Sequence, residues 1–174
     1  MLEHAKALVE QWPHDSKSRD LVLMLLRHTP APYSREQFMP GHITATACVL
    51  HPDGRRFLLV HHKRLDRWLF PGGHVEKEDA AIWDTARREA VEETGVLLSP
   101  QIPKLIGIDV HGIPGKKHEP YHLHHDLVFC FRALADAFVA SEETRAVAWC
   151  SAAELDRYQL PASIRECVAR SSSN

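Results

Sequence analysis

Three glutamates at helical spacing are the residues of this chain best suited to chemistry. At about 100° per residue, Glu89, Glu92 and Glu93 fall within an arc of about 100° on one helix face. Like charges at this spacing repel one another, and a cation bound between them removes the repulsion. Carboxylate oxygens suit hard divalent ions, so we expect a Mg²⁺ or Mn²⁺ site here. The alternative is a solvated acidic helix face, which is the commoner role of such a pattern.

The surrounding segment, residues 69–96 (LFPGGHVEKEDAAIWDTARREAVEETGV), favours the metal site. A Pro-Gly-Gly turn precedes the helix, Arg88 comes immediately before the first glutamate, and Gly95 ends the helix. Trp83, Ala86 and Ala90 fall on the adjacent face and are expected to pack against the core. The order Gly-Gly, then Arg-Glu-x-x-Glu-Glu-x-Gly, resembles the signature of the Nudix (MutT-like) hydrolases, and REAVEETGV fits its second half throughout.

The first half of this signature departs from the family pattern. The family places five residues between the glycine and an acidic residue, and then seven before the arginine. Here five residues after Gly73 lead to Asp79, but eight residues then separate Asp79 from Arg88. The structural acid that fixes the loop and the helix in the family is therefore either Asp79 or Glu78.

The resemblance implies an α/β fold of the Nudix type, an α/β/α sandwich with a mixed β-sheet. It also implies a metal-dependent pyrophosphohydrolase that cleaves the diphosphate linkage of a nucleoside diphosphate joined to a group X. An ADP-sugar and a modified nucleoside triphosphate are the first substrates to consider. By the same resemblance, Glu89, Glu92 and Glu93 are metal ligands with the Gly72 carbonyl as a further one, and Arg88 orients the glutamates.

The resemblance leaves the general base and the substrate open. Glu93 or Glu89 could serve as the base, as could Glu119 or Glu142 from later loops. The signature recognises metal and diphosphate and says little about X. Two alternatives therefore remain: an isomerase or a hydrolase of a non-nucleotide diphosphate on the same fold, and a nucleotide-binding module without turnover. Because such modules usually lose the glutamates, which this chain keeps, the enzyme is favoured.

Two further groups of residues are candidates for substrate binding. Arg64 and Arg67 lie in a basic loop that leads into the Gly-Gly turn, where they could contact phosphate. His122, His124 and Asp126 alternate with apolar residues and share one face of an expected strand. Imidazoles can donate hydrogen bonds to a diphosphate, so we expect His122 or His124 to contact substrate rather than metal.

Composition is that of an ordinary globular domain. Of the 174 residues, 44% are apolar and 25% charged, and the net charge of −2 provides no basic field for a nucleic-acid polymer or a membrane surface. The four cysteines form no C-x-x-C pair, which favours reduced thiols in a cytoplasmic protein.

The expected elements divide the chain into an N-terminal helical extension, residues 1–40, and the Nudix domain, residues 41–170. The extension should contain a helix over 2–12, a second helix capped by Asp15 or Ser16 with a fully buried run over 21–26, and a short helix at 34–37. It could cover the fold or form a homodimer contact. The domain should contain strands at 42–50, 56–61, 105–111, 121–133 and 146–150, and helices at 152–158 and 164–169.

Overall fold

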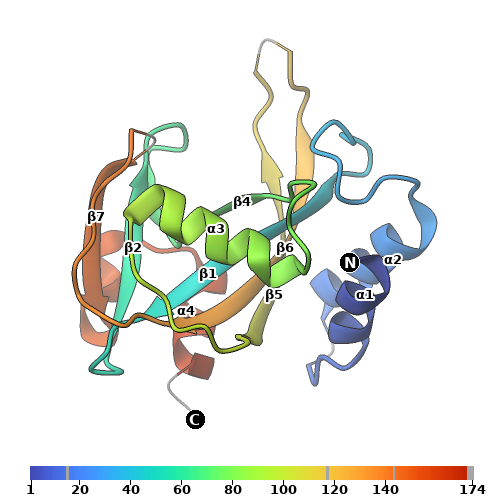
Figure 1. Ribbon diagram of the computed structural model, residues 1–174. Coiled ribbons are helices and arrows are strands. Elements are labelled where there is room, and N and C mark those ends of the chain that lie inside the picture. Colours follow the sequence, from blue (N-terminus) through green and yellow to red (C-terminus); the bar gives the residue numbers. More distant parts are fainter. Residues whose placement is uncertain (15, 117, 143, 172–174) are drawn as a thin grey trace.

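The computed structural model describes residues 1–14, 16–116, 118–142 and 144–171 (Figure 1). Its elements, in chain order, are α1 (Leu2–Glu10), α2 (Lys17–His28), β1 (His42–Leu50), β2 (Arg56–His62), β3 (Arg67–Leu69), β4 (Gly72–His74), α3 (Ile82–Thr94), β5 (Lys104–Ile113), β6 (His122–Arg132), β7 (Thr144–Ser151), the 3₁₀-helix η1 (Ala152–Tyr158) and α4 (Ala162–Ser171).

One seven-stranded mixed sheet forms the centre of the molecule. Its main order is β3-β2-β1-β6-β5, with β4 paired to β1 and β7 paired to β2. The central pair β1–β6 is parallel, and the other pairs are antiparallel. The β5–β6 hairpin projects beyond the sheet (Figure 1).

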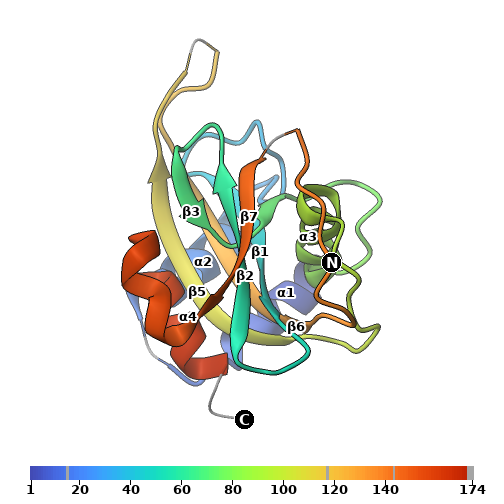
Figure 2. The ribbon, with the colours of Figure 1, turned by 90° about the vertical axis from the view of Figure 1, so that its left-hand side faces the viewer.

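Helices cover both faces of this sheet, with α3 on one side and α4 on the other (Figure 2). Side chains alternate along β1, so that Ala45 and Ala47 pack with Ala86 and Ala90 of α3. Cys48 faces the other way and joins the cluster that contains Cys167 of α4. The predicted α/β/α sandwich with a mixed sheet is confirmed.

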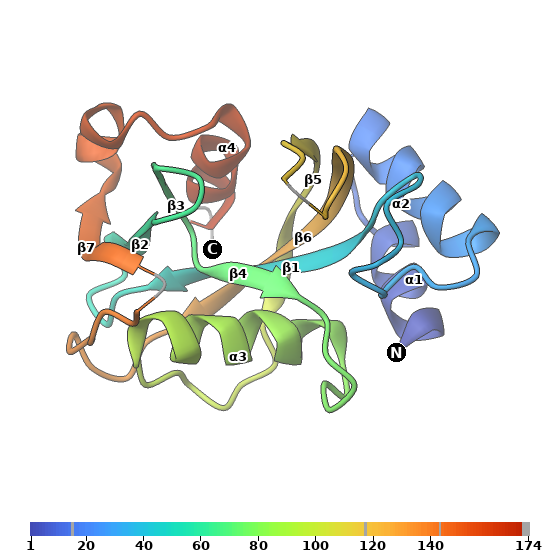
Figure 3. The same ribbon diagram turned by 90° about the horizontal axis from the view of Figure 1, so that it is seen from above.

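The N-terminal extension packs against the sheet. Ser16 caps α2 by accepting a hydrogen bond from the backbone N–H of Arg19 (3.1 Å), whereas Asp15 lies outside the described residues. Val22 and Leu25 of α2 join the α3-side core, and α1 and α2 lie together beside the sheet (Figure 3). The extension therefore covers part of the fold, while its separation as a domain and a homodimer contact remain proposals.

Two expectations about local structure were wrong, and the helix expected at 152–158 is present but of the 3₁₀ type. The run over 21–26 is not buried all round, because Leu21 (41% exposed) and Met24 (59% exposed) lie on the outer face of an amphipathic helix. Residues 34–37 form turns rather than a helix. Residues 152–158 form a 3₁₀-helix, which Glu154 caps by accepting hydrogen bonds from the N–H (2.9 Å) and the hydroxyl (2.6 Å) of Ser151.

Among the described residues, no helix combines the length and the apolar character that crossing a bilayer requires.

One buried histidine gives the fold an expected acid sensitivity. Burial, together with the smaller effect of the nearby His42, lowers the pKa of His125 to about 4, so this ring is neutral in the folded state. The unfolded ring titrates near its ordinary value of 6.5. The unfolded state therefore binds more protons between these pKa values, and stability falls as pH falls, by up to about 1.4 kcal/mol per pH unit.

We expect His125→Gln to reduce the loss of unfolding free energy between pH 7 and pH 5 by roughly 1–2 kcal/mol, because one titrating group has been removed. Urea unfolding at pH 7, 6 and 5 measures this loss in both proteins. The exposed His28 provides the control variant His28→Gln, which should keep the wild-type pH dependence. Equal pH dependence in all three proteins would contradict the expectation.

Candidate active site

Helix α3 carries the predicted glutamates, and both of its ends are well defined. The carboxylate of Asp84 accepts a hydrogen bond from the N–H of Ala81 at the start of the helix (2.9 Å). Gly95 ends it with φ 61°, a left-handed conformation that glycine adopts without strain. Ala86 and Ala90 are fully buried, as predicted for the packed face. This packing fixes the rotation of the helix and turns Glu93, which is only 5% exposed, towards β4.

The Gly-Gly segment forms β4 and lies directly against the glutamates. The N–H of Gly72 donates to Oε1 of Glu93 (3.0 Å). A Cβ at Gly73 would lie 2.5 Å from Oε1 of Glu89, so any larger residue would displace this carboxylate. A Cβ at Gly72 would lie 2.5 Å from Oγ1 of Thr46 on β1. Both glycines are therefore required for the close approach of β4 to its neighbours.

Arg88 connects the glutamates with the loop before the helix. Its Nη1 donates to Oε1 of Glu89 (2.9 Å) and to Oε2 of Glu92 (3.1 Å). Its Nη2 donates to the carbonyl of His74 (2.7 Å) and to Oδ2 of Asp79 (3.1 Å). Burial alone would lower the pKa of Arg88, but the carboxylates raise it above its ordinary value, so the guanidinium stays charged. Its contacts are those expected of a residue that orients the glutamates.

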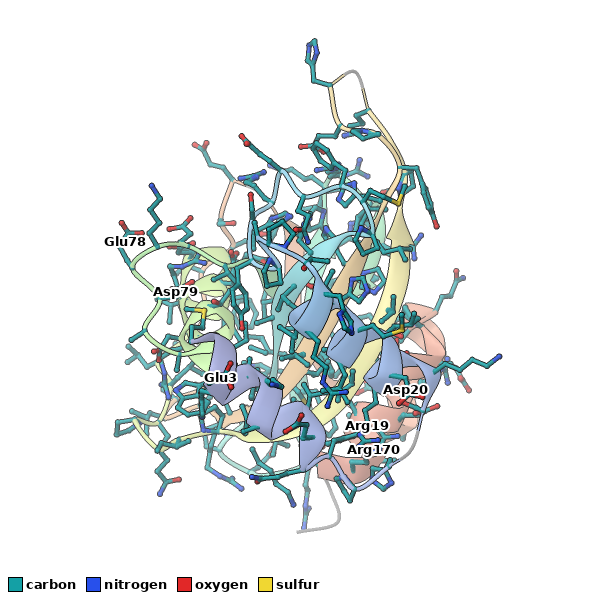
Figure 4. All side chains as sticks on the ribbon, turned by 90° about the vertical axis from the view of Figure 1, so that its right-hand side faces the viewer. Glu3, Arg19, Asp20, Glu78, Asp79 and Arg170 are labelled. Carbon is teal, nitrogen blue, oxygen red and sulfur yellow. The ribbon has the colours of Figure 1, made fainter. Side chains whose placement is uncertain are left out.

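Asp79, rather than Glu78, contacts Arg88. Oδ2 of Asp79 also accepts hydrogen bonds from the N–H of Glu76 (2.9 Å) and the hydroxyl of Thr85 (2.7 Å). Burial opposes ionisation of Asp79, but these donors and Arg88 lower its pKa overall. Figure 4 shows Glu78 at the outer edge of the same loop, and its side chain is exposed. The geometry therefore favours Asp79 as the structural acid despite the extra residue.

We expect Asp79→Ala to lower kcat/KM by about 10–100-fold, the usual effect of removing a residue that positions metal ligands. Arg88 would lose the partner that holds it in place, and the glutamates would lose their orientation. The matched control is Glu78→Ala on the same loop, which should leave kcat/KM within about twofold of wild type. A loss of kcat/KM in Glu78→Ala but not in Asp79→Ala would make Glu78 the structural acid. If neither variant lowers kcat/KM, neither residue has this role.

The glutamates suit a hard divalent ion in their chemistry. All their potential ligand atoms are oxygens, and one of the carboxylates lies against the bare Cα of Gly73. Arg88 now occupies the space between Glu89 and Glu92, so an ion would have to compete with or displace these ion pairs. The assignment of Glu89, Glu92, Glu93 and the Gly72 carbonyl as ligands remains a proposal.

The basic loop after β2 has internal partners. Arg64 forms an ion pair with Glu119 at the tip of the β5–β6 hairpin (2.6 Å), which joins the two segments. This contact with Arg64 lowers the pKa of Glu119. Lys63 donates to the backbone carbonyl of Glu142. Arg67 is exposed at the start of β3. The structure does not test the roles of Arg64 and Arg67 in substrate binding.

The histidine row on β6 belongs to a larger cluster that sequence analysis missed. His42 on β1 lies opposite His124 in the parallel register, and its ring centroid is 4.9 Å from that of His124. His74 on β4 contacts both rings, and His122 lies beside them. The pKa of His74 is lowered to about 4 and that of His124 to about 2. Burial is the largest cause in both cases, and the charges of the neighbouring histidines contribute next. The high histidine content was the available signal, but spacing along the chain does not show which strands pair.

A comparison with protein families decides the relationship. The model described as NUDIX domain matches residues 40–170 of the chain. The chain belongs to the Nudix family. The prediction from the Gly-Gly turn and the REAVEETGV segment is therefore confirmed.

Individual relatives of this Nudix chain share its fold or part of its sequence. Phosphatase NudJ of Escherichia coli K12 is 39% identical over 62 residues, which are 34% of this chain and 39% of NudJ, so the match spans only about two fifths of that relative. The MutT protein of Methanosarcina mazei has a TM-score of 0.55 at 25% identity, covering 74% of this chain and 91% of its own. An ADP-ribose pyrophosphatase from Streptococcus suis has a TM-score of 0.54 at 19% identity, covering 76% and 92%.

Proposed function

We propose that this Nudix protein is a metal-dependent pyrophosphohydrolase that cleaves the diphosphate linkage of a nucleoside diphosphate joined to a group X. The observation that carries the proposal is the α3–β4 arrangement, in which Arg88 contacts Glu89 and Glu92 while Glu93 binds the N–H of Gly72. A binding module would not need three carboxylates of which an arginine orients two and a backbone N–H orients the third.

Each residue of the site has a distinct task in this proposal. Glu89, Glu92 and Glu93, with the carbonyl of Gly72, hold Mg²⁺ or Mn²⁺. The ion supplies positive charge for the diphosphate oxygens and makes a nearby water more acidic. Arg88 keeps Glu89 and Glu92 in place, and Asp79 in turn keeps Arg88 in place.

The general base must accept a proton from the attacking water, and the contacts of the candidate residues favour some of them over others. Glu119 is engaged by Arg64 at 2.6 Å, which lowers its pKa and makes it a weaker base. Glu142 follows Ser141, whose N–H donates to the carbonyl of Glu93 (3.1 Å), so its segment lies beside the end of α3. Glu93, Glu89 and Glu142 are therefore the candidates that we retain. Because the base must be ionised, activity should rise from acid to mildly alkaline pH.

Arg67 and His122 are the residues that we consider first for substrate binding. Arg67 is an exposed cation without a described acidic partner and suits a phosphate. His122 is buried and both of its ring nitrogens already have partners, so a hydrogen bond to the substrate would require this ring to change partners. Similar folds carry names as different as Ap4A hydrolase, from C. elegans, and ADP-ribose pyrophosphatase, from S. suis. The identity of X must therefore come from an assay, with ADP-sugars and modified nucleoside triphosphates tested first.

The test is a substrate panel with Mg²⁺ or Mn²⁺ that contains ADP-ribose, ADP-glucose, a dinucleoside tetraphosphate and oxidised nucleoside triphosphates. Cleavage of an ADP-sugar creates phosphomonoesters, so alkaline phosphatase converts each turnover into free phosphate. Wild-type protein should release phosphate from at least one class, and a Glu92→Gln, Glu93→Gln double variant should release none above background. Tight binding without turnover would identify a binding module and contradict the proposal. If the protein hydrolysed only a non-nucleotide diphosphate, the proposal that its substrate contains a nucleoside would be contradicted.

A further inference from the structure

Three strands bring three imidazoles to one point on the sheet. His42 of β1 lies opposite His124 of β6, and His74 of β4 lies opposite Thr44 of β1. Residues paired across strands point to the same face, so all three side chains share one side of the sheet. The ring centroids form a nearly equilateral triangle, with distances of 4.9, 5.0 and 5.1 Å. One ring nitrogen from each residue lies within 4.8 Å of the other two.

These distances are close to those of a metal centre. A tetrahedral zinc site with Zn–N bonds of about 2.0–2.1 Å places its ligand nitrogens about 3.3 Å apart. Modest rotations of the rings would close the triangle to that size. Within the described part of the chain, these three histidines are the group of potential metal ligands whose ligand atoms come together in this way.

The hydrogen bonds leave His42 with a nitrogen suited to a metal. Its Nδ1 lies 3.2 Å from the carbonyl of Gln37, an acceptor that fixes the proton on Nδ1. Its Nε2 then carries a lone pair, is buried, and has no described hydrogen-bond partner. Metal-binding histidines generally donate their other N–H to such a carbonyl, which orients the ring. Buried nitrogens without a partner are uncommon, and a cation would satisfy this one.

A second hydrogen-bond chain orients His124. Nδ1 of His122 lies 2.9 Å from the carbonyl of Pro120, so it donates and leaves the lone pair on Nε2. This Nε2 lies 3.3 Å from Nε2 of His124, which must then donate. In this arrangement Nδ1 of His124 carries the lone pair. Neutral imidazoles suit zinc, nickel, copper and cobalt rather than the hard ions expected at carboxylates.

The cluster is separate from the glutamates. The Cβ position of Gly73 points at the carboxylate of Glu89 on the α3 side, and successive residues of a strand point to opposite faces. The side chain of His74 therefore lies on the other face of β4. His111, with 45% of its side chain exposed, contacts His124 and marks the side on which the cluster reaches solvent.

We propose that His42, His74 and His124 form a second metal centre that binds a d-block divalent cation such as Zn²⁺. Three imidazoles supply three ligands, and the fourth position is left for water or another ligand from the solvent side. This centre goes beyond the pyrophosphohydrolase function and does not depend on it. Bound ion would cross-link β1, β4 and β6 and so stabilise the folded chain.

The test uses full-length protein without a histidine tag, stripped with chelator and dialysed into saturating Mg²⁺ to occupy the carboxylates. Titration with Co²⁺ should produce the intense visible absorption of a four-coordinate ion, saturating at one equivalent. His42→Gln, His74→Asn and His124→Gln should each lower Co²⁺ affinity by more than about 100-fold, beyond the effect of losing an outer hydrogen-bond partner. Zn²⁺ should raise Tm in wild type and not in these variants.

Two controls separate this centre from other binding. His28→Ala, at an exposed histidine of α2, and Glu92→Gln, on α3, should both retain the Co²⁺ spectrum. Circular dichroism verifies folding, and His74→Asn, at a half-buried position, carries the test if a variant at the fully buried His42 does not fold. No intense absorption in wild type, retention of it in His74→Asn, or its loss in Glu92→Gln would each overturn the proposal.

Discussion

Treatment with excess chelator is expected to abolish hydrolysis, and Mg²⁺ alone is expected to restore it. Without a divalent ion, the diphosphate would lie beside the charges of Glu89, Glu92 and Glu93, which Arg88 offsets only in part, and water is a poor nucleophile at neutral pH. The expected loss is at least about 10³-fold, the scale of a lost catalytic group. The measurement is initial rate in EDTA, then after dialysis against Mg²⁺, Mn²⁺ or Zn²⁺.

Restoration by Mg²⁺ alone would assign the essential ion to the carboxylates, because the histidine centre prefers softer ions. Full turnover in excess chelator would remove the metal assignment altogether. Recovery with Zn²⁺ but not with Mg²⁺ would contradict the assignment of a hard-ion site to the glutamates.

Glu93→Gln is expected to lower turnover by about 10²–10⁴-fold, the range for lost metal or base function. The amide oxygen of Gln can still accept the hydrogen bond that Gly72 donates at 3.0 Å, so β4 should keep its place. The negative charge is lost, and with it a metal ligand or a base. Single-turnover rates with saturating Mg²⁺ separate this chemical defect from weaker metal binding.

Glu92→Gln tests the exposed end of the same cluster and should also lose about 10²–10⁴-fold in rate. Removing one of several like charges on a helix would by itself raise stability, but Nη1 of Arg88 already contacts both Glu89 and Glu92. Both variants should therefore unfold within roughly 3 °C of wild type, equivalent to about 1 kcal/mol. Wild-type turnover in both variants would show that the acidic face is only solvated.

The spacing of residues within short segments of the sequence was enough to predict the family and the fold of this protein. The spacing of Glu89, Glu92 and Glu93, the arginine before them and the preceding Gly-Gly turn carried the resemblance that indicated the family and the sandwich fold. These inferences succeeded because they depend on residues within one helix and one turn, whose relative positions follow from helix geometry. The β-branched and apolar residues of the segment also predicted β1 correctly from His42 to Leu50.

Tertiary structure decided what depends on residues far apart in sequence. Spacing could not choose between Glu78 and Asp79, because the choice depends on how the loop turns Asp79 towards Arg88. The pattern of residue types along the sequence could not place His42 beside His124, 82 positions away, because strand pairing depends on the whole sheet. Each helix or strand presents its side chains by a short-range rule, but the long-range packing of strands selects which side chains meet. That packing gives the carboxylates and the imidazoles opposite faces of β4, a separation that only the folded chain reveals.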